Sequence, residues 1–519
     1  MTSRPAHGPP DVTARGLGDW PTPEWLCQQV FDVLVRRGAR YTRVLEPTCG
    51  AGGFLRAALD AYPALDEIVG LEIQDDHLRE AHRLTKDERL RLANADVFKT
   101  NLQSDIRWET TGPLLVVGNP PWVTNAELGS LGGRNLPEKS NLRGLNGLDA
   151  MTGASNFDIA EHICLKILSE LGPEKPTLAF LVKTSVARNV LELSRQLGQP
   201  VQRASIHRFD ASEAFGAAVD ACLLVMEMGG TDILEEVPVF ASLTDDRPSH
   251  TFGFSNGELI ADVRSYERSR HLDGASMLTW RQGVKHDASR VMELERAADG
   301  ALRNKLGEVV DVEDDYVYPL LKATQLHKGE TSHTPRWVIV TQRSLQDDTR
   351  ALRREAPLLW AYLSSHRDVL DARKSSVYRG KPPFVMFGVG DYSFADHKVA
   401  VSGLHKAPRF RILRPLAGKP VMVDDTSYLL PCANARQAAV VKATLDSSPV
   451  RDLLRALVFS DSKRPVTKRL LQRIDLAAAL DGEHAPAILR QANRILDQEL
   501  TSSGDAIDIT DARLNVLAS

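Results

Sequence analysis

The segment Val44-Leu-Glu-Pro-Thr-Cys-Gly-Ala-Gly-Gly-Phe-Leu55 decides the fold predicted for this chain. It reads as a short apolar strand, a glycine-rich turn and the start of a helix. Glycine permits positive φ and lets a ligand approach the main chain closely. Glu46 stands at the carboxyl end of the strand, where open α/β sheets bind ligands. That carboxylate, and the lack of a Lys-Ser/Thr pair, argue against a phosphate-binding P-loop.

Apolar runs of strand length alternate with helical patterns through the N-terminal half. The expected strands are 42–45, 67–73, 113–118, 177–182, 205–209 and 221–226, and the expected helices are 54–62, 75–84 and 159–171. This alternation predicts a mostly parallel sheet with helices on both faces. The Gly-rich stretch 125–155 interrupts the alternation and is too long for an ordinary connection. The alternation stops near Met228, and 253–274 reads as a linker.

Composition and charge exclude several classes of protein. The 519 residues are 43% hydrophobic and 25% charged, a globular mixture, and a net charge of -4 excludes a cationic coat over the whole chain. The five cysteines are scattered without a C-x-x-C pair, so neither a disulfide framework nor a metal site is predicted. No apolar run reaches the length of a membrane span, and the N-terminus lacks an apolar signal core. We therefore expect a cytoplasmic protein without a membrane partner.

Acidic residues recur at the ends of successive expected strands. Glu72 ends the second strand, 26 residues after Glu46, and Asp96 follows the expected third strand. A carboxylate in the position of Glu72 typically accepts hydrogen bonds from ribose hydroxyls. Three such carboxylates suit a nucleoside that carries hydroxyls, an amino group and a positive charge. The sequence therefore predicts S-adenosylmethionine as the cofactor, in preference to a dinucleotide.

The tetrapeptide Asn119-Pro-Pro-Trp122 directly follows an expected strand. Two consecutive prolines fix φ and remove two backbone donors, and Pro121 biases Pro120 toward an extended conformation. In the resulting rigid turn, the Asn119 amide and the Pro120 carbonyl match the two N–H groups of an exocyclic amine. Trp122 adds a flat surface for a planar base. This arrangement favours methyl transfer to a weakly nucleophilic amino group by alignment and electrostatics.

On these motifs the chain resembles the gamma-class N6-adenine DNA methyltransferases of restriction-modification systems. The family order is kept: a first cofactor segment, here Asp19-Trp-Pro-Thr-Pro-Glu24, then the Gly-rich motif, the Asn-Pro-Pro-aromatic motif and a target-recognition domain. The aromatic position is often Tyr in the family, so Trp122 keeps the stacking role but loses the hydroxyl. The match spans 19–228, which is under half of the chain.

The resemblance implies where the cofactor would bind. Thr22 would lie near its methionine carboxylate, and the loop 46–52 would hold the methionine. Glu72 would bind the ribose hydroxyls, and Asp96 would contact the adenine. The residues expected to bind the cofactor are Thr22, Glu46, Pro47, Thr48, Cys49, Gly50, Gly52, Glu72, Ile73, Asp96, Val97 and Asn119.

The resemblance also implies where the target adenine would bind. The expected catalytic residues are Asn119, Pro120, Pro121, Trp122 and Phe215. Phe215 precedes the strand 221–226 and would form the second wall of the base pocket, opposite Trp122. Asn156 and Lys183 lie near expected strand ends as well, and the sequence assigns them no role.

The C-terminal half is expected to bind DNA. Residues 336–420 hold 16 Lys and Arg against 7 Asp and Glu, a local balance of +9, with aromatic residues between the charges. Such cations favour phosphate contacts, and an adenine within a duplex must be flipped out while the flanking DNA is held. We therefore expect two domains. Residues 1–265 would form a Rossmann-like methyltransferase domain with a seven-stranded, mostly parallel sheet, and 266–519 an α+β target-recognition domain for double-stranded DNA.

Three alternatives stay open. The same tetrapeptide also serves enzymes that methylate RNA adenine or a protein glutamine, although those are typically compact. A non-catalytic DNA-binding subunit of a defence complex is the second, and an altered tetrapeptide would favour it, whereas 119–122 is intact. A fused nuclease is the third. No paired-carboxylate-plus-Lys arrangement stands out in the C-terminal half, so we expect a restriction endonuclease, or other defence-complex subunits, as separate partners.

Overall fold

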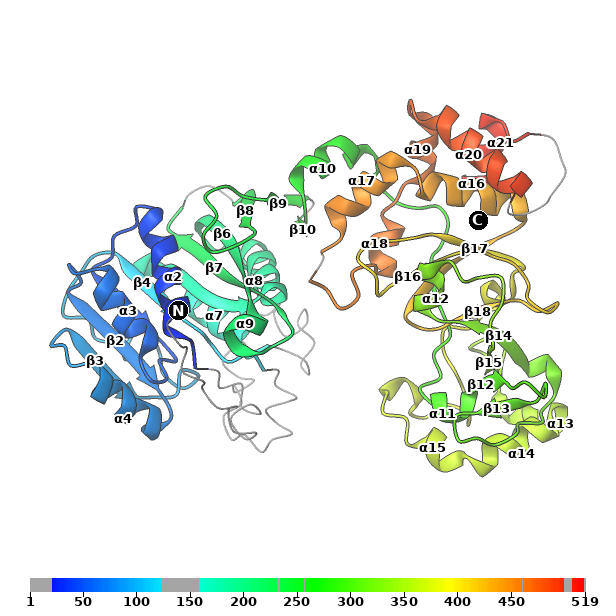
Figure 1. Cartoon of the computed structure of the whole chain (residues 1–519), viewed down its shortest axis with the longest axis horizontal. Helices are drawn as coiled ribbons and strands as arrows, with labels where there is room; N and C mark the ends of the chain where they lie inside the picture. Colours follow the sequence, from blue (N-terminus) through cyan, green and yellow to red (C-terminus); the bar gives the residue numbers. More distant parts are fainter. Residues whose placement is uncertain are drawn as a thin grey trace, which may run out of the picture. The chain divides into compact units, whose positions relative to one another are not determined.

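The computed structural model describes residues 21–123, 158–230, 234–255, 257–459, 461–498 and 506–517. The chain divides into two compact units, Met1–Val263 and Arg264–Ser519, which are coloured from blue to green and from green to red in Figure 1. The expected domain boundary lay at 265/266. Within the described part of the chain, no helix is both long and apolar enough to cross a membrane.

The first unit contains one ten-stranded sheet with the order β10-β9-β8-β6-β7-β5-β4-β1-β2-β3. The strands are β1 Arg43–Glu46, β2 Glu67–Glu72, β3 Leu90–Asn94, β4 Leu114–Gly118, β5 Thr177–Lys183, β6 Val201–Asp210, β7 Asp220–Met228, β8 Glu236–Phe240, β9 His250–Ser255 and β10 Glu258–Ile260. Strands β1 to β5 pair in parallel, whereas β7 is antiparallel to both β5 and β6. The sheet is therefore parallel at its centre and mixed toward β10.

The expected seven strands are present, but the sheet continues beyond them. Strands β8 to β10 extend it past β6, with β8 parallel to β6 and β9 antiparallel to β8. The interpretation of 253–274 as a linker is therefore wrong, because this stretch contains β10 and a helix, α10 (Val263–Ser269). Its apolar residues are too few for a clear periodic pattern, yet Leu259 and Ile260 are buried.

Helices cover the sheet of the first unit. They are α2 Glu24–Arg36, α3 Gly53–Ala61, α4 Asp75–Leu84, α7 Ile159–Glu170, α8 Thr184–Gln196 and α9 Ala211–Phe215. Side chains alternate along a strand, so each strand packs against both helical layers. Val44, Leu115 and Val117 belong to the core cluster that includes α2 and α3. The expected bounds of α4 are confirmed residue for residue, while α2 and α8 were not predicted from the sequence.

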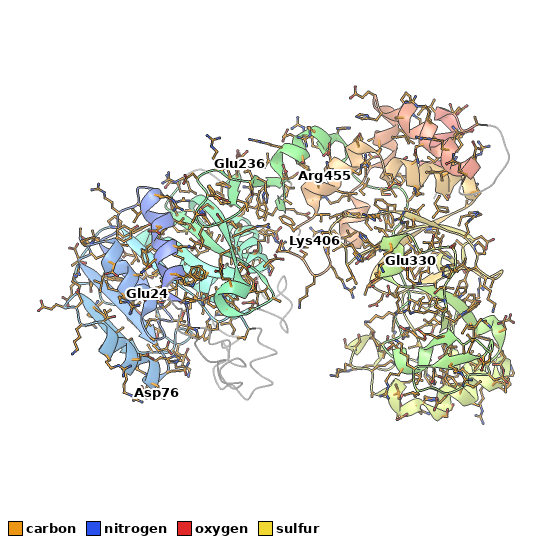
Figure 2. The ribbon with its side chains drawn as sticks, viewed as in Figure 1. Glu24, Asp76, Glu236, Glu330, Lys406 and Arg455 are labelled. Carbon is orange, nitrogen blue, oxygen red and sulfur yellow. The ribbon has the colours of Figure 1, made fainter. Side chains whose placement is uncertain are left out.

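The second unit contains a four-stranded sheet, β11-β19-β16-β17, and a five-stranded sheet, β13-β12-β15-β14-β18. The strands are β11 Arg281–Gln282, β12 Glu293–Arg296, β13 Leu302–Asn304, β14 Val317–Leu321, β15 Arg336–Ile339, β16 His397–Ser402, β17 Arg411–Leu413, β18 Met422–Val423 and β19 Ser427–Cys432. The helices are α11 Ser289–Met292, α12 Ala323–Lys328, α13 Leu352–Glu355, α14 Pro357–Ser365, α15 Arg367–Asp371, α16 Ala435–Leu445, α17 Ser448–Leu457, α18 Lys468–Gln472, α19 Leu476–Asp481, α20 Ala485–Gln498 and α21 Ile509–Leu517. This is the α+β composition expected for this half. Charged side chains such as Asp76 in the first unit and Lys406 in the second are exposed to solvent (Figure 2).

Candidate functional site

Most of the expected cofactor residues lie at one edge of the central sheet. Strand β1 lies between β2 and β4 and pairs in parallel with both. The carboxyl ends of parallel strands therefore meet at the same edge, which brings Glu46, Glu72 and Asn119 to neighbouring positions. Asp96 lies two residues beyond the end of β3, farther along that edge. Asp19 and Trp20 of the first cofactor segment lie outside the described residues.

The Gly-rich turn is held in place by Glu72. Its carboxylate accepts the backbone N–H of Gly50 at 2.8 Å and that of Gln74 at 2.8 Å. Gly50 and Gly52 have φ of +50° and +82°, a region that glycine adopts at little cost. An ionised carboxylate has about four acceptor positions. Glu72 therefore shapes the turn and has acceptor positions beyond the two that these N–H groups use.

Glu46 is a buried carboxyl group with an unsatisfied oxygen. Its side chain is 2% exposed, and within the described residues its Oε2 atom has no hydrogen-bond partner. The same holds for Oγ1 of Thr48. Burial, and then the Glu72 carboxylate, raise the pKa of Glu46 well above its usual range, although the Leu55 N–H opposes the shift. Because unsatisfied buried acceptors are rare, these atoms fit a ligand that brings donors and positive charge, as the ammonium of S-adenosylmethionine would.

The remaining expected cofactor residues surround this turn. Pro47 and Cys49 are both buried in the turn itself, and burial raises the pKa of the Cys49 thiol. The Asp96 carboxylate accepts the N–H of Phe98 at 3.0 Å, which leaves it oriented at the strand end. Val97 is buried, whereas Ile73 exposes 43% of its surface. Ile73 therefore offers an apolar face beside the Glu72 carboxylate.

The tetrapeptide lies next to this cofactor edge. The Asn119 side-chain N–H donates to the Thr22 hydroxyl oxygen at 3.2 Å, so the first cofactor segment contacts the tetrapeptide. A Cβ added at Gly118 would lie 3.5 Å from Cγ of Glu46. The chain entering the tetrapeptide therefore passes directly over the buried carboxyl group. Three motifs that are far apart in the sequence meet here.

Trp122 and Phe215 are brought together, but not as two facing walls. Their rings are in edge contact, with centroids 5.2 Å apart and planes at 81°. Both side chains are buried, and the indole N–H of Trp122 donates to the Leu181 carbonyl at 3.1 Å. A planar base does not fit between rings that touch each other, so the expected two-walled pocket is not formed in this arrangement. The sequence shows ring types and spacing, but not how the rings pack.

Lys183, to which the sequence assigned no role, also reaches the tetrapeptide. The Lys183 ammonium donates to the Trp122 carbonyl at 2.9 Å and to the Asp158 carboxylate at 2.9 Å. Lys183 ends β5, the strand next to β4, and this adjacency is the signal that sequence reasoning missed. Asn156 and the stretch 125–155 lie outside the described residues.

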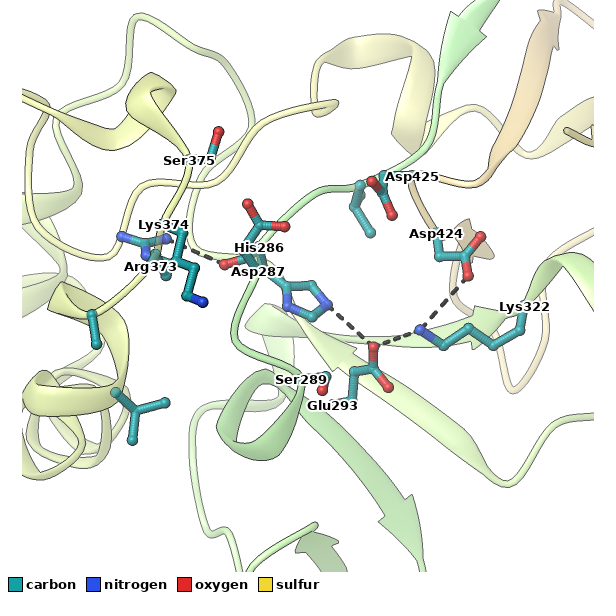
Figure 3. Close-up of a pocket in the computed structure, with 13 residues that line it drawn as sticks. His286, Asp287, Ser289, Glu293, Lys322, Arg373, Lys374, Ser375, Asp424 and Asp425 are labelled. Carbon is teal, nitrogen blue, oxygen red and sulfur yellow. Dashed lines mark hydrogen bonds and ion pairs between the residues drawn. The ribbon is translucent and has the colours of Figure 1, made fainter. Parts of the chain in front are cut away.

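The second unit contains a cavity of about 550 Å³ (Figure 3). The buried residue Glu293 lies in the wall of this cavity. Its carboxylate forms ion pairs with Lys322 and Lys305, and it lies 3.5 Å from Nε2 of His286. Burial raises the pKa of Glu293, but bonds from His286, Lys305 and Lys322 outweigh burial and hold it well below its usual range. Lys322 also lies 3.7 Å from Asp424. These carboxylates are neutralised internally, and no His/Cys/Asp/Glu cluster able to hold a metal occurs among the described residues.

Seven strands of the sheet follow the order β6-β7-β5-β4-β1-β2-β3, with one strand reversed. This order, and a cofactor edge suited to S-adenosylmethionine, define a Rossmann-like class I methyltransferase that depends on this cofactor. No protein-family model matches the sequence. The type II methyltransferase M.NspV from Nostoc sp. is 36% identical over 473 residues, which are 90% of this chain and 97% of that protein. The chain belongs to the type II methyltransferases of restriction-modification systems.

A solved structure with a similar fold is that of the type IIL restriction-modification enzyme MmeI in complex with DNA. It matches with a TM-score of 0.57 at 12% identity and covers 95% of this chain and 72% of that chain. At this identity the likeness shows the fold alone, and its coverage includes residues of both units. The predicted fold class and the predicted cofactor are thus confirmed.

Proposed function

We propose that this protein transfers the methyl group of S-adenosylmethionine to N6 of an adenine that is flipped out of double-stranded DNA. The observation that carries the proposal is the intact tetrapeptide 119–122 at the carboxyl end of β4, with Asn119 bonded to Thr22 and beside the buried Glu46. An amino group inside a duplex is out of reach of such a site, so the base must leave the stack.

The chemistry asks little of the protein except alignment. The lone pair of an adenine N6 is delocalised into the ring, which makes the nitrogen a weak nucleophile. The Asn119 amide oxygen and the Pro120 carbonyl would accept its two N–H groups and draw the nitrogen toward a tetrahedral shape. S-adenosylmethionine supplies an electrophilic sulfonium methyl. As the new N–C bond forms and the C–S bond breaks, the two acceptors stabilise positive charge on nitrogen, and one N–H proton leaves to solvent.

DNA as the substrate is supported by the family, by the DNA in the MmeI complex and by exposed cations in the second unit. The structure sorts the cations of 336–420 into two groups. Several are paired with a nearby carboxylate or buried, such as Arg350 with Asp348 and the buried Lys398. The others are exposed, and their side chains make no hydrogen bond or ion pair with a described residue: Arg353, Lys374, Arg379, Lys381, Lys406, Arg409 and Arg414.

The two groups lead to a prediction for DNA affinity. The triple variant Lys374→Ala/Arg379→Ala/Lys381→Ala should bind duplex DNA more weakly and with a shallower salt dependence. Each lost phosphate contact lowers the slope of log K against log salt by about 0.9. Fluorescence anisotropy of a labelled duplex between about 50 and 200 mM salt measures this slope, and cofactor affinity should not change.

The control carries the same change in charge. Arg350→Ala/Arg354→Ala/Arg367→Ala removes three exposed arginines that are each paired with a carboxylate, namely Asp348, Glu355 and Asp371. An arginine that is already paired with a carboxylate is a poor phosphate contact. Replacing these three arginines should therefore leave the salt slope near that of the unaltered protein. Equal slopes for the two triple variants would contradict the assignment of phosphate contacts to the unpaired cations.

The proposed reaction is tested by finding the methylated product. The protein is incubated with tritiated cofactor and, in parallel, with duplex DNA, RNA of the same sequence, and protein substrates containing glutamine. We expect label in DNA alone and N6-methyldeoxyadenosine after digestion to nucleosides. N4-methyldeoxycytidine as the product would refute adenine as the target, and label in RNA or protein would refute DNA. That a separate restriction endonuclease acts as the partner of this protein stays a prediction.

A further inference from the structure

The turn that carries the tetrapeptide cannot be fixed by its own backbone donors. Pro120 and Pro121 have no N–H, so they cannot continue the parallel ladder between β4 and β5. That ladder ends with Gly118 opposite Phe180, whereas β5 runs on for three more residues to Lys183. The end of β5 therefore lies beside the tetrapeptide without backbone bonds from the two prolines.

Contacts from the end of β5 take the place of those missing bonds. The Leu181 carbonyl accepts the indole N–H of Trp122 at 3.1 Å, and the Lys183 ammonium donates to the Trp122 carbonyl at 2.9 Å. The first contact fixes the ring of Trp122, and the second fixes its main chain. The residue that ends the tetrapeptide is thus held at two points by the neighbouring strand.

The same ammonium reaches the start of α7. Lys183 is paired with Asp158 at 2.9 Å, and Asp158 caps α7 by accepting the N–H of Ala160 at 3.1 Å. The backbone N–H of Ile159 donates to the Val123 carbonyl at 3.0 Å. The Lys183 and Asp158 side chains are only 23% and 11% exposed. Removing one member of a pair so shielded leaves an uncompensated charge and is costly.

We propose that Lys183 and Asp158 are positioning residues that hold the Asn-Pro-Pro-Trp turn in its productive geometry, an inference that rests on the proposed function. Lys183 bonds to the residue that closes the turn, three positions after Asn119. Misplacing a catalytic group by about 1 Å can cost about 100-fold in rate. The cofactor residues Glu46 and Glu72 lie on other strands, and neither makes a hydrogen bond or ion pair with Lys183, so rate and cofactor affinity should respond differently.

The test compares three substitutions in the full-length protein. Lys183→Met keeps the shape of the side chain and removes both bonds, so we expect the single-turnover rate on duplex DNA to fall about 10- to 100-fold. The dissociation constant for S-adenosylhomocysteine should stay within about twofold, since Lys183 does not touch the Gly-rich turn. Lys183→Arg keeps the charge and should recover a large part of the rate. Asp158→Asn keeps a cap for α7 but loses the ion pair, and should slow the reaction as well.

Lys166→Met is the matched control. Lys166 is also a shielded lysine paired with a carboxylate, Glu170, but it lies about two helix turns along α7 from Asp158. Its loss should lower stability without changing the rate of methyl transfer. If Lys183→Met and Lys166→Met had the same rate, or if Lys183→Met lost cofactor affinity in step with rate, the positioning role would be refuted.

The outcome also separates this inference from the proposed function. The unaltered protein is assayed beside each variant, and its product is identified as a nucleoside. Absence of N6-methyldeoxyadenosine from the unaltered protein refutes the proposed function. Its presence, together with an undiminished rate in Lys183→Met, refutes the positioning role alone. If Lys183→Met does not fold, Asp158→Asn decides in its place, and an undiminished rate in that variant refutes the positioning role.

Discussion

Replacing Asn119 by alanine is expected to lower the single-turnover rate of DNA methylation by about 100- to 1000-fold, the cost of losing one preorganised polar contact to a transition state. The reason is geometric. Asn119 stands at the end of β4, its amide is oriented by the bond to Thr22, and the prolines that follow make the turn rigid. Without the amide oxygen, one N–H of the target amine loses its acceptor at the moment when charge develops on nitrogen.

Cofactor affinity should respond far less in Asn119→Ala, because Glu46, Glu72 and the Gly-rich turn are unchanged. Rapid-quench measurement of single turnover gives the rate, and isothermal titration gives the dissociation constant. Asn189→Ala is the control, since Asn189 is an asparagine of the same unit, at an exposed position of α8, whose side-chain N–H donates to Glu161 at 3.0 Å. A rate for Asn119→Ala that equals the rate for Asn189→Ala would exclude Asn119 from catalysis.

The sequence predicted those parts of the fold that depend on local pattern. The strands around the segment 44–55 alternate with helices, and their apolar runs are buried on both faces, so their existence follows from composition alone. The strand-end carboxylates Glu46 and Glu72 were predictable for the same reason, because parallel strands align their carboxyl ends. Strands β8 to β10 were not predicted, since they are short and only the pairing of β8 with β6 joins them to the rest of the sheet.

The parts that the sequence could not show depend on which side chain meets which. Trp122 and Phe215 have the ring types of a base pocket, yet they contact each other at their edges. Lys183 is separated from the tetrapeptide by a long stretch of sequence, and the pairing of β4 with β5 brings it there. Asp158 is joined to this region through its ion pair with Lys183. The balance of +9 over 336–420 already subtracts the carboxylates within that stretch. It still overstated the cations available to DNA, because Lys419 pairs with Asp314 outside the stretch and Lys398 is buried.

The affinity for S-adenosylmethionine should rise with pH, because Glu46 has to lose a proton to pair with a cation. Burial, and then Glu72, raise the pKa of Glu46 well above its usual range. Between the usual and the raised pKa, the folded protein without cofactor holds this proton and the unfolded chain does not, so this group's contribution to stability falls as pH rises. A bound ammonium favours the ionised carboxylate, so cofactor binding releases the proton. The affinity should therefore increase by up to about tenfold per pH unit until the raised pKa is passed.

Titration calorimetry between about pH 5.5 and 7.5 measures this slope, a range in which an α-amino group of pKa about 8 stays mostly protonated. Two buffers of different ionisation enthalpy count the protons released. Glu46→Gln should abolish the slope and weaken binding about 100-fold at the upper end of the range, the scale of a buried charge pair.

Glu161→Gln is the matched control, because burial raises the pKa of Glu161 to about 7 in the same unit, on a helix away from the Gly-rich turn. Its loss should change the pH dependence of stability and leave the slope of cofactor affinity intact. Binding of S-adenosylmethionine that is independent of pH in the unaltered protein would show that Glu46 does not pair with the cofactor's ammonium group.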